Sequence, residues 1–452
     1  MPRKRDDYNF DCMFFNSPEY VAFFAVLFVL YLMTNRMKLL PLRNALLLLG
    51  SYYFYAQLHV WFVLLLLYTT VVNYLCGRWI EHCLGRGRGA KAAVTVAIIL
   101  SLAILVVFKY AYVYDASVVL PVGLSFFTFQ ALTYSIDIYR RKIVAEKNPL
   151  DVALFIAFFP TLLSGPIERA RNLIPQLKKP THVGWEAVTG GAGLFVWGLF
   201  KKVVIADRLA DYVDLAYANA GYQSGSTLAI AAIFYSFQIY CDFSGYADMA
   251  IGTGKMLGFN IMDNFRFPYC VNTIKEFWRR WHMSLTSWFT EYVYISMGGN
   301  RVSHARWLLN ISTVFLLSGI WHGATWSFVV WGAMHAVFYL CERRWGPKRP
   351  GVLYHLFVFV LVTLAWIFFR VDFSTAVMVM GKIGTDLFSP VSMGASAFST
   401  MLTAMLLLAF VTREYLLYTG RLPRKSVIEH VLLVLCICLF GASSDQFVYF
   451  QF

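Results

Sequence analysis

The chain has 452 residues, of which 59% are hydrophobic and 14% are charged. Soluble domains use roughly 45–50% apolar and about 25% charged residues, so this composition excludes an ordinary water-soluble domain. The formal net charge of +14 comes from 39 Lys and Arg residues that are scattered between apolar runs, which argues against a nucleic-acid-binding face.

Apolar runs recur from one end of the chain to the other. A helix needs about 20 apolar residues to cross a bilayer, so we expect an all-α, multi-pass integral membrane protein of about 10–12 transmembrane helices with additional interfacial helices. The longest run is either a kinked helix or a paired hairpin. The runs lie near residues 19–34, 44–57, 58–77, 92–110, 114–137, 150–165, 187–206, 227–251, 307–341, 351–370, 398–418 and 427–442.

Basic residues follow the first, third and fifth of these runs. By the positive-inside rule the loops that carry them are cytoplasmic and the N-terminus lies outside. The basic cluster at residues 3–5 contradicts this unless Met13 is the true start. We therefore expect 1–12 to be an N-terminal extension and 13–452 to be one membrane-embedded domain, with a catalytic core at about 120–340. The basic residues are Arg36, Lys38, Arg43, Arg78, Arg86, Arg88, Lys91, Arg140, Arg141, Lys142 and Lys147.

The eight cysteines are dispersed without a C-x-x-C pair, so no zinc ribbon, redox motif or other metal site is predicted. The chain also lacks G-x-S-x-G, P-loop and H-E-x-x-H motifs. Polar residues inside the apolar runs are therefore the candidates for functional residues, because burying a polar side chain in hydrocarbon costs free energy and usually indicates a function.

His322 is the strongest candidate for a catalytic residue, and it lies within the apolar run FLLSGIWHGATWSFVVWGAMHAVF. Burial disfavours the charged imidazolium, so the ring is expected to be neutral and able to act as a general base. Gly319, Gly323 and Ala324 are expected to leave room around it. The alternative is a core histidine bonded to a neighbouring helix. His335 would lie about 220° further around one continuous helix and is expected to be structural.

The segment KEFWRRWHMSLTSWF at 275–289 is expected to form an amphipathic interfacial helix. Arg279 and Arg280 would face water or phosphate, and His282 would border the apolar arc and could point into a cavity. The alternative is a basic surface helix on anionic lipid. The arc spans about 100° on an ideal helix. It consists of Trp278, Trp281, Leu285, Trp288 and Phe289.

Polar residues also interrupt the run FYSFQIYCDFSGYADMAIG. Gln238, Asp242 and Tyr246 follow i, i+4 spacing, and Ser244 and Asp248 form a parallel pair, so we expect them to meet basic groups or hydroxyls inside the bundle. A purely structural polar network is the alternative.

Two further segments carry polar residues at depth. LSGPIERARNLIPQL breaks at Pro166 and is expected to be a re-entrant or loop element that could bind anions. The run from Pro121 to Arg140 carries Gln130, Tyr134 and Asp137.

Stretches from residue 13 to the last residue together resemble the membrane-bound O-acyltransferase family, within its alginate O-acetylase and peptidoglycan O-acetyltransferase branch. The YFQF ending favours this branch over D-alanylation of teichoic acids. The stretches are MFFNSPEY at 13–20, GLSFFTFQALTYSIDIYR at 123–140, FFPTLLSGPIERA at 158–170, FSGYADMAIGTGKMLGF at 243–259, NFRFPY at 264–269, EFWRRWHMSLTSWF at 276–289, YISMGGNR at 294–301, GIWHGATWSFVVWGAMH at 319–335 and VYFQF at 448–452.

This resemblance implies helices around a central tunnel, with His322 as the catalytic histidine and His282 as the second family histidine. Trp278, Trp321 and Asn300 lie in stretches that match the family. They are candidates for substrate binding or tunnel lining, together with Gln238, Asp242, Ser244, Tyr246, Asp248, Arg279 and Arg280.

The resemblance further implies that the protein transfers an acyl group, which we expect to be acetyl, in the bacterial inner membrane. The donor would be a cytoplasmic acyl-CoA or acyl-carrier thioester, and no cofactor would be permanently bound. The acceptor would be alginate, peptidoglycan or another envelope polysaccharide, reached through a periplasmic acetyltransferase. Membrane lipids, but no nucleic acid, are expected as further partners. The competing hypothesis is a transporter or channel with a buried proton relay, although the chain shows no matching halves.

Overall fold

The computed structural model describes residues 13–114, 120–348, 350–394, 396–422 and 427–442, and these residues contain helices but no strand. They fall into two compact units, one within Met1–Phe195 and Ala247–Met262 and the other within Val196–Tyr246 and Asp263–Phe452. The all-α prediction is confirmed. The predicted extension 1–12 and the VYFQF ending lie outside the described residues.

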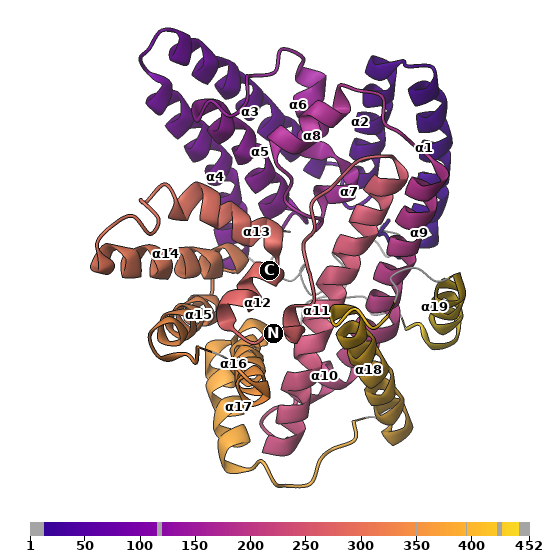
Figure 1. Cartoon of the computed structure of the whole chain (residues 1–452), viewed down its shortest axis with the longest axis vertical. Coiled ribbons are helices and arrows are strands. Elements are labelled where there is room, and N and C mark those ends of the chain that lie inside the picture. Colours follow the sequence, from indigo (N-terminus) through magenta and orange to yellow (C-terminus); the bar gives the residue numbers. More distant parts are fainter. Residues whose placement is uncertain (1–12, 115–119, 349, 395, 423–426, 443–452) are drawn as a thin grey trace. The chain divides into compact units, whose positions relative to one another are not determined.

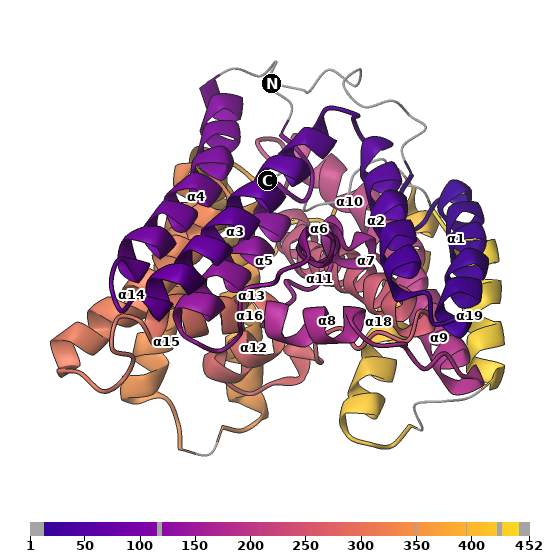
Figure 2. The same cartoon turned by 90° about the horizontal axis from the view of Figure 1, so that it is seen from above.

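The first unit consists of short and long helices, among which α3, α4 and α5 pack side by side (Figures 1 and 2). Its last two helices approach so closely that a Cβ on Gly191 would lie 2.6 Å from the carbonyl oxygen of Gly252. Small residues at such positions let helix backbones come into contact. The helices are α1 (Pro18–Arg36), α2 (Leu40–Ala56), α3 (Phe62–Gly85), α4 (Ala90–Tyr114), α5 (Leu124–Tyr139), α6 (Pro149–Ala157), α7 (Phe159–Leu162), α8 (Ala170–Leu177), most of α9 (Trp185–Phe200) and the end of α11 (Gly225–Met256).

The second unit begins inside α9 and contains most of α11, and its helices α14, α15 and α16 follow one another as packed neighbours (Figure 1). Of the two alternatives for the 307–341 run, a kinked helix or a paired hairpin, the structure contains the pair of helices, because one helix ends at His322 and the next begins at Trp326. The further elements are η1 (Lys201–Ala206), α10 (Asp207–Ala218), η2 (Pro268–Cys270), α12 (Ile274–Arg280), α13 (Met283–Trp288), η3 (Phe289–Tyr294), α14 (His304–His322), α15 (Trp326–Trp345), α16 (Val352–Arg370), α17 (Phe373–Thr385), α18 (Ala397–Tyr418) and α19 (Val427–Phe440).

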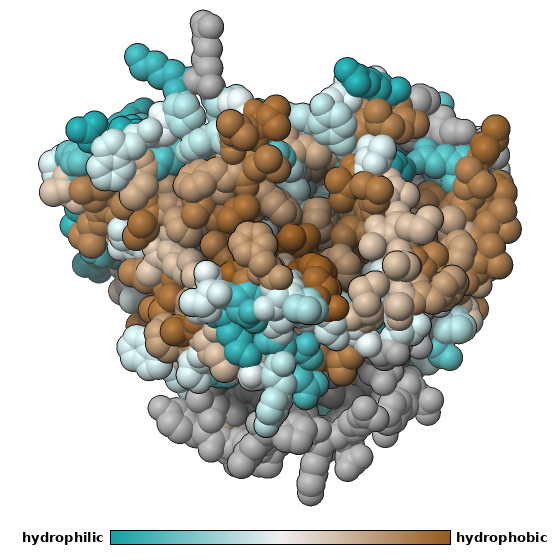
Figure 3. Space-filling model, turned by 90° about the horizontal axis from the view of Figure 1, so that it is seen from below, coloured by the Kyte–Doolittle hydropathy of each residue, from teal (hydrophilic) through white to brown (hydrophobic). Residues whose placement is uncertain are grey.

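Within the described residues, seven helical stretches are long and apolar enough to cross a membrane, which bears out a multi-pass membrane protein. Several of the other predicted runs form shorter helices, such as α5 and α6. Large apolar side chains are exposed on these stretches, including Val26 and Met33 of α1, and apolar residues cover much of the face in Figure 3. Such surface suits lipid rather than water. The seven stretches are Pro18–Arg36, Phe62–Gly85, Ala90–Ala111, Trp185–Ala218, Gly225–Met256, Val352–Arg370 and Ala397–Tyr418.

Arg43 does not lie on a loop, as the charge pattern had indicated, but is fully buried in α2. Its guanidinium donates hydrogen bonds to the side-chain oxygen of Asn44 at 2.8 Å, to that of Asn35 at 3.2 Å and to the carbonyl of Lys179 at 2.8 Å. These oxygens satisfy the donors of the rigid guanidinium fork, which explains its burial. Arg43 therefore carries no information on which loops are cytoplasmic.

Candidate active site

His322 is the last residue of α14, in the second unit, and its side chain is 4% exposed. Its ring is surrounded by aromatic rings, with centroid separations of 4.8 Å to Trp321, 5.2 Å to Trp331 and 5.1 Å to Phe369. Such surroundings exclude water and have a low dielectric constant, which favours the neutral form of imidazole.

The glycines beside His322 serve the hairpin rather than leave room around the imidazole ring. A Cβ on Gly319 would lie 2.3 Å from the carbonyl oxygen of Phe328, and one on Gly323 would lie 2.2 Å from the Phe328 ring. The two glycines therefore allow α15 to pack directly against α14. The expectation of open space around the histidine is wrong on this side, because Phe328 occupies it.

His282 interrupts the segment that was predicted to be one amphipathic helix. The chain forms α12 up to Arg280 and α13 from Met283, and His282 between them has a left-handed backbone, with φ 43° and ψ 52°. Few residues other than glycine adopt this region, and histidine is among those enriched there. The apolar side chains assigned to the arc are buried within the protein instead of lying at a lipid interface. They are Trp278, Trp281, Leu285, Trp288 and Phe289.

Asn264 fixes the tautomer of His282. The Asn264 side-chain oxygen accepts hydrogen bonds from the backbone N–H of Ser284 at 3.2 Å and from its hydroxyl at 2.8 Å, and it lies 3.1 Å from Nδ1 of His282. Because a backbone N–H can only donate, this atom is an acceptor, and Nδ1 must carry the proton. Burial lowers the pKa of His282 to about 3, so the neutral ring has its lone pair on Nε2.

The structure brings the two predicted histidines together, with a distance of 6.3 Å between the ring centroids of His282 and His322. Trp321 contacts both rings, at 5.9 Å from His282 and 4.8 Å from His322. Phe243 of α11 packs edge-on against His282 at 4.7 Å. The result is a buried pair of imidazoles enclosed by aromatic side chains from α11, α14, α15 and α16.

Two of the candidates on α11, Asp242 and Ser244, flank Phe243 and contact lysines that the sequence analysis did not single out. Lys202 in η1 contacts Asp242 at 2.8 Å and Asp207 at 2.7 Å, with all three side chains buried; we call these residues the lysine–aspartate cluster. Lys201 donates a hydrogen bond to the Ser244 hydroxyl at 2.8 Å. The signal for both lysines was their position inside the apolar run 187–206, where a charge requires a partner.

The remaining candidates on α11 divide between the two units. Gln238 and Tyr246 are buried in the second unit, whereas Asp248 is half-buried in the part of α11 that belongs to the first. The predicted pairing of this polar run with basic groups therefore holds for Asp242 through Lys202.

Among the other candidates of the second unit, the two arginines and Asn300 are more exposed, whereas Trp278 is buried. Arg279 is exposed on α12, and Arg280 is half-buried with its guanidinium 5.2 Å from the ring of Tyr418. Asn300 is exposed in the turn between η3 and α14. Trp278 lies among the aromatic side chains of α14 and α15, with its ring 5.7 Å from that of Trp331.

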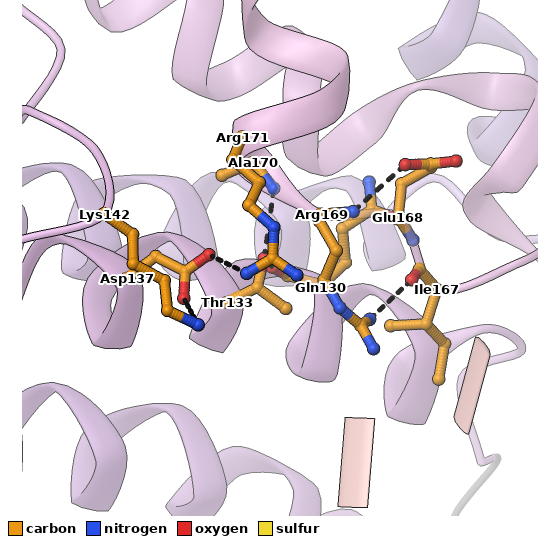
Figure 4. A network of polar contacts seen from close by, with 9 residues as sticks. All are labelled: Gln130, Thr133, Asp137, Lys142, Ile167, Glu168, Arg169, Ala170 and Arg171. Atoms are coloured by element: carbon orange, nitrogen blue, oxygen red, sulfur yellow. Dashed lines mark hydrogen bonds and ion pairs between the residues drawn. The ribbon is translucent and has the colours of Figure 1, made fainter. Parts of the chain in front are cut away.

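A separate polar network in the first unit joins α5 to the loop before α8 (Figure 4). Asp137 is fully buried and accepts a hydrogen bond from Arg171 at 3.3 Å, while Lys142 lies 4.0 Å away. Gln130 accepts from the backbone N–H of Glu168 at 3.2 Å. Burial raises the pKa of the Glu168 carboxyl group. The predicted loop element is found only at residues 163–169, because the rest of the segment LSGPIERARNLIPQL forms α8. Its anion-binding role stays a prediction.

Among the residues that the structure describes, no group of three or more His, Cys, Asp or Glu side chains is arranged to hold a metal ion. The imidazole nitrogens of the histidine pair can transfer protons and form hydrogen bonds in surroundings of low dielectric constant.

An all-helical, multi-pass membrane protein with a buried histidine pair is the class that this fold and site define. The chain belongs to the membrane-bound O-acyltransferase family, whose model matches residues 12–374.

Three relatives illustrate the similarity. A probable alginate O-acetylase of Azotobacter vinelandii is 42% identical over 56% of this chain and 52% of its own length. One of Pseudomonas aeruginosa is 37% identical over 73% of this chain and 67% of its own. A peptidoglycan O-acetyltransferase of Helicobacter pylori is 36% identical over 60% of this chain and 58% of its own. The matched part thus spans only about half of the Azotobacter relative.

Proposed function

We propose that this protein is an O-acyltransferase that moves an acyl group, in the first instance acetyl, from a thioester donor toward a hydroxyl group of an envelope polysaccharide. The single observation that carries this proposal is the buried pair of His282 and His322, at 6.3 Å, in a member of the membrane-bound O-acyltransferase family. The names of the relatives, which include an alginate O-acetylase and a peptidoglycan O-acetyltransferase, support acetyl transfer to a polysaccharide.

In the proposed reaction His322 is the general base. The acceptor hydroxyl attacks the carbonyl carbon of the thioester, its proton passes to the imidazole of His322, and the carbon–sulfur bond breaks to release the thiolate, which takes up a proton. A hydroxyl is a weak nucleophile unless a base activates it. His282, with its lone pair on Nε2, orients the thioester. The aromatic enclosure excludes water, which would otherwise compete as acceptor.

We further propose the acyl donor, the partner protein and the membrane location for this reaction. The donor is acetyl-CoA or an acyl-carrier thioester that enters from the cytoplasm through a central tunnel, where Arg279 and Arg280 hold its anionic groups. A periplasmic acetyltransferase passes the acyl group to alginate, peptidoglycan or another polysaccharide. The protein resides in the inner membrane, and both units form one functional domain over 13–452, since α9 and α11 run through both.

Orientation is testable by cysteine labelling. Residues 78–91, which include the end of α3 and the turn after it, and residues 140–149 should be cytoplasmic, and the chain near Phe14 should be periplasmic. Cysteines introduced at 86–88 in a variant without native reactive cysteines should be protected from an impermeant maleimide in intact cells and labelled after permeabilisation. Labelling in intact cells would reverse the proposed orientation.

The direct test of the function is incubation of the purified protein with radiolabelled acetyl-CoA and a hydroxyl acceptor, with His322→Gln as the matched inactive control. Thioester consumption with label on the acceptor is the expected result. Ion-gradient-driven flux in proteoliposomes without thioester consumption would support the transporter hypothesis and refute the acyltransferase.

A further inference from the structure

His335 lies on α15 inside an enclosure of aromatic rings in the second unit. Its side chain has no exposed surface. The centroid of its ring is 4.9 Å from the ring of Trp278 and 4.9 Å from that of Trp331. Further rings lie at 5.7–6.4 Å. They belong to Phe277, Phe315, Phe338 and Trp366.

Several hydrogen-bonding atoms in this enclosure have no partner among the described residues. They are both ring nitrogens of His335 and the indole nitrogens of Trp278 and Trp331. Roughly 90% or more of buried polar groups in proteins are paired, so such a concentration requires an explanation. The indole of Trp366, beside the same histidine, shows the usual situation, because it donates to the hydroxyl of Tyr269 at 3.1 Å.

Contacts with the ring faces do not replace these hydrogen bonds. The rings of His335 and the two unpaired indoles meet edge-on, at 84° for Trp278 and 67° for Trp331. This geometry permits N–H···π contacts, which are second-order interactions compared with a full hydrogen bond. A histidine that only filled space would therefore be a poor choice here, since a phenylalanine would fill the same space without buried polar atoms.

The donor inventory indicates what the enclosure binds. Each indole is a donor only, and a neutral imidazole has one donor and one acceptor, so the three side chains together offer more N–H groups than acceptors. Their complement is an atom that accepts hydrogen bonds, such as an oxygen. Trp331 also contacts the ring of His322 at 5.2 Å, so one side chain separates His335 from the proposed base.

We propose that Trp278, Trp331 and His335 form a binding site for a hydrogen-bond-accepting oxygen atom that acyl transfer at His322 requires. The oxygen is the acyl carbonyl of the thioester or an ordered water, and this inference rests on the proposed acyltransferase function. The reason to regard His335 as structural was a continuous helix through both histidines. That reason does not hold, because α14 ends at His322 and α15 begins at Trp326.

The exchange His335→Phe separates this role from packing. It retains an aromatic ring and removes both nitrogens. If His335 only packs, the variant keeps its activity, and its melting temperature stays the same or rises because unpaired buried polar atoms are gone. If the site binds an oxygen, kcat falls by about 10²–10³-fold, as for loss of one oxyanion donor, while the melting temperature does not fall. His335→Asn retains an N–H donor and should recover part of the rate.

Two tryptophan variants form a matched pair of controls. Trp278→Phe removes an unpaired indole N–H and should lower the acetyl-transfer rate in the same direction as His335→Phe. Trp366→Phe removes an indole that already has its partner in Tyr269, so it should lower the melting temperature and leave the rate per folded molecule unchanged. Equal rates in Trp278→Phe and wild type would contradict the proposal.

Two coenzyme A derivatives identify the oxygen. Acetonyl-CoA is a ketone that keeps the carbonyl, and ethyl-CoA is a thioether that lacks it. If the site binds the carbonyl, His335→Phe lowers the affinity for acetonyl-CoA by about 10-fold and leaves the affinity for ethyl-CoA unchanged. If the site holds water, neither affinity changes although transfer falls. Wild-type transfer rate together with unchanged affinities in His335→Phe would overturn the site.

Failure of the site and failure of the proposed function are distinguishable. A wild-type protein that transfers no acetyl group would refute the function. In that case, weaker binding of acetonyl-CoA to His335→Phe would still support the oxygen site, and unchanged binding would overturn it.

Discussion

Replacement of His322 tests the proposed chemistry, and the packing around the ring determines which replacement is informative. Removal of a general base typically costs about 10²–10⁴ in rate. At about 1.36 kcal/mol per factor of ten, this corresponds to about 2.7–5.4 kcal/mol of transition-state stabilisation. We expect His322→Ala and His322→Gln both to lose acetyl transfer by at least this factor.

The two variants should differ in stability. The rings of Trp321, Trp331 and Phe369 pack around the imidazole at 4.8–5.2 Å, so alanine leaves a cavity between them. Large-to-small substitutions in packed cores cost about 2–5 kcal/mol. His322→Gln retains more of the side-chain volume and should accumulate closer to the wild-type amount, which makes it the cleaner test of chemistry.

The assay is transfer of radiolabelled acetyl from acetyl-CoA, normalised to the amount of folded protein measured by fluorescence-detected gel filtration. A loss of rate in His322→Gln at normal abundance is the expected result. Near wild-type acetylation in His322→Gln would refute the assignment of His322 as the base. Disappearance of both variants from the membrane would instead show that His322 is a packing residue.

Three other predictions concern the surroundings of the histidines. Asn264→Leu removes the acceptor for Nδ1 of His282 and should lower the acetyl-transfer rate by about 10–100-fold, with wild-type rates counting against tautomer control. Arg279→Ala with Arg280→Ala should raise KM for acetyl-CoA with at most a small fall in melting temperature, because Arg279 is exposed and Arg280 is only half-buried, and surface cations contribute little to stability; a loss of folding would contradict a binding role. Lys202→Met removes the shared cation of the lysine–aspartate cluster and should destabilise the protein by about 3–5 kcal/mol. An unchanged melting temperature in detergent would refute that pairing.

The sequence was informative where the physical constraint is local. Seven stretches of spanning length, the pair of helices in the 307–341 run and the non-helical residues after Pro166 follow from hydropathy, glycine and proline. Other runs, such as 150–165, form helices too short to span. The two histidines stood out because an ionisable ring in an apolar run needs a reason. Their separation of 6.3 Å is a tertiary fact that no local pattern contains.

The sequence misled where a helix was assumed to continue. The helical wheel over 275–289 presumes one axis, but His282 adopts a left-handed backbone that ends α12 and starts α13. The same assumption separated His335 from His322. A break at a non-glycine, non-proline residue leaves no signature in composition, because tertiary contacts such as the bond to Asn264 hold it in place.

Polar partners were similarly hard to foresee. Lys202 and Asp242 lie in different helices, and only packing shows that they pair at 2.8 Å. Arg43 looked like a loop charge because it follows Arg36 and Lys38 between two apolar runs, yet carbonyl and amide oxygens within the first unit satisfy its donors. A charge can be buried only where partners lie close to it in space, and the sequence does not show which distant residues come together.

The positions of the two histidines also support the different roles that we propose for them. His322 ends a helix of 19 residues, where the carbonyl groups of the last turn and the negative end of the helix dipole stabilise a positive charge by about 0.3–1 kcal/mol, up to about 2 kcal/mol when partly buried. Such help on protonation suits a base that takes a proton only transiently. His282 lies between α12 and α13 and is the N-cap of α13, where the positive end of the helix dipole does not favour a charged ring. Its Nδ1 proton is held by Asn264, and burial keeps its pKa near 3, so the ring stays neutral and can orient a substrate through Nε2. These positions support the proposal that His322 accepts the proton and His282 positions the substrate.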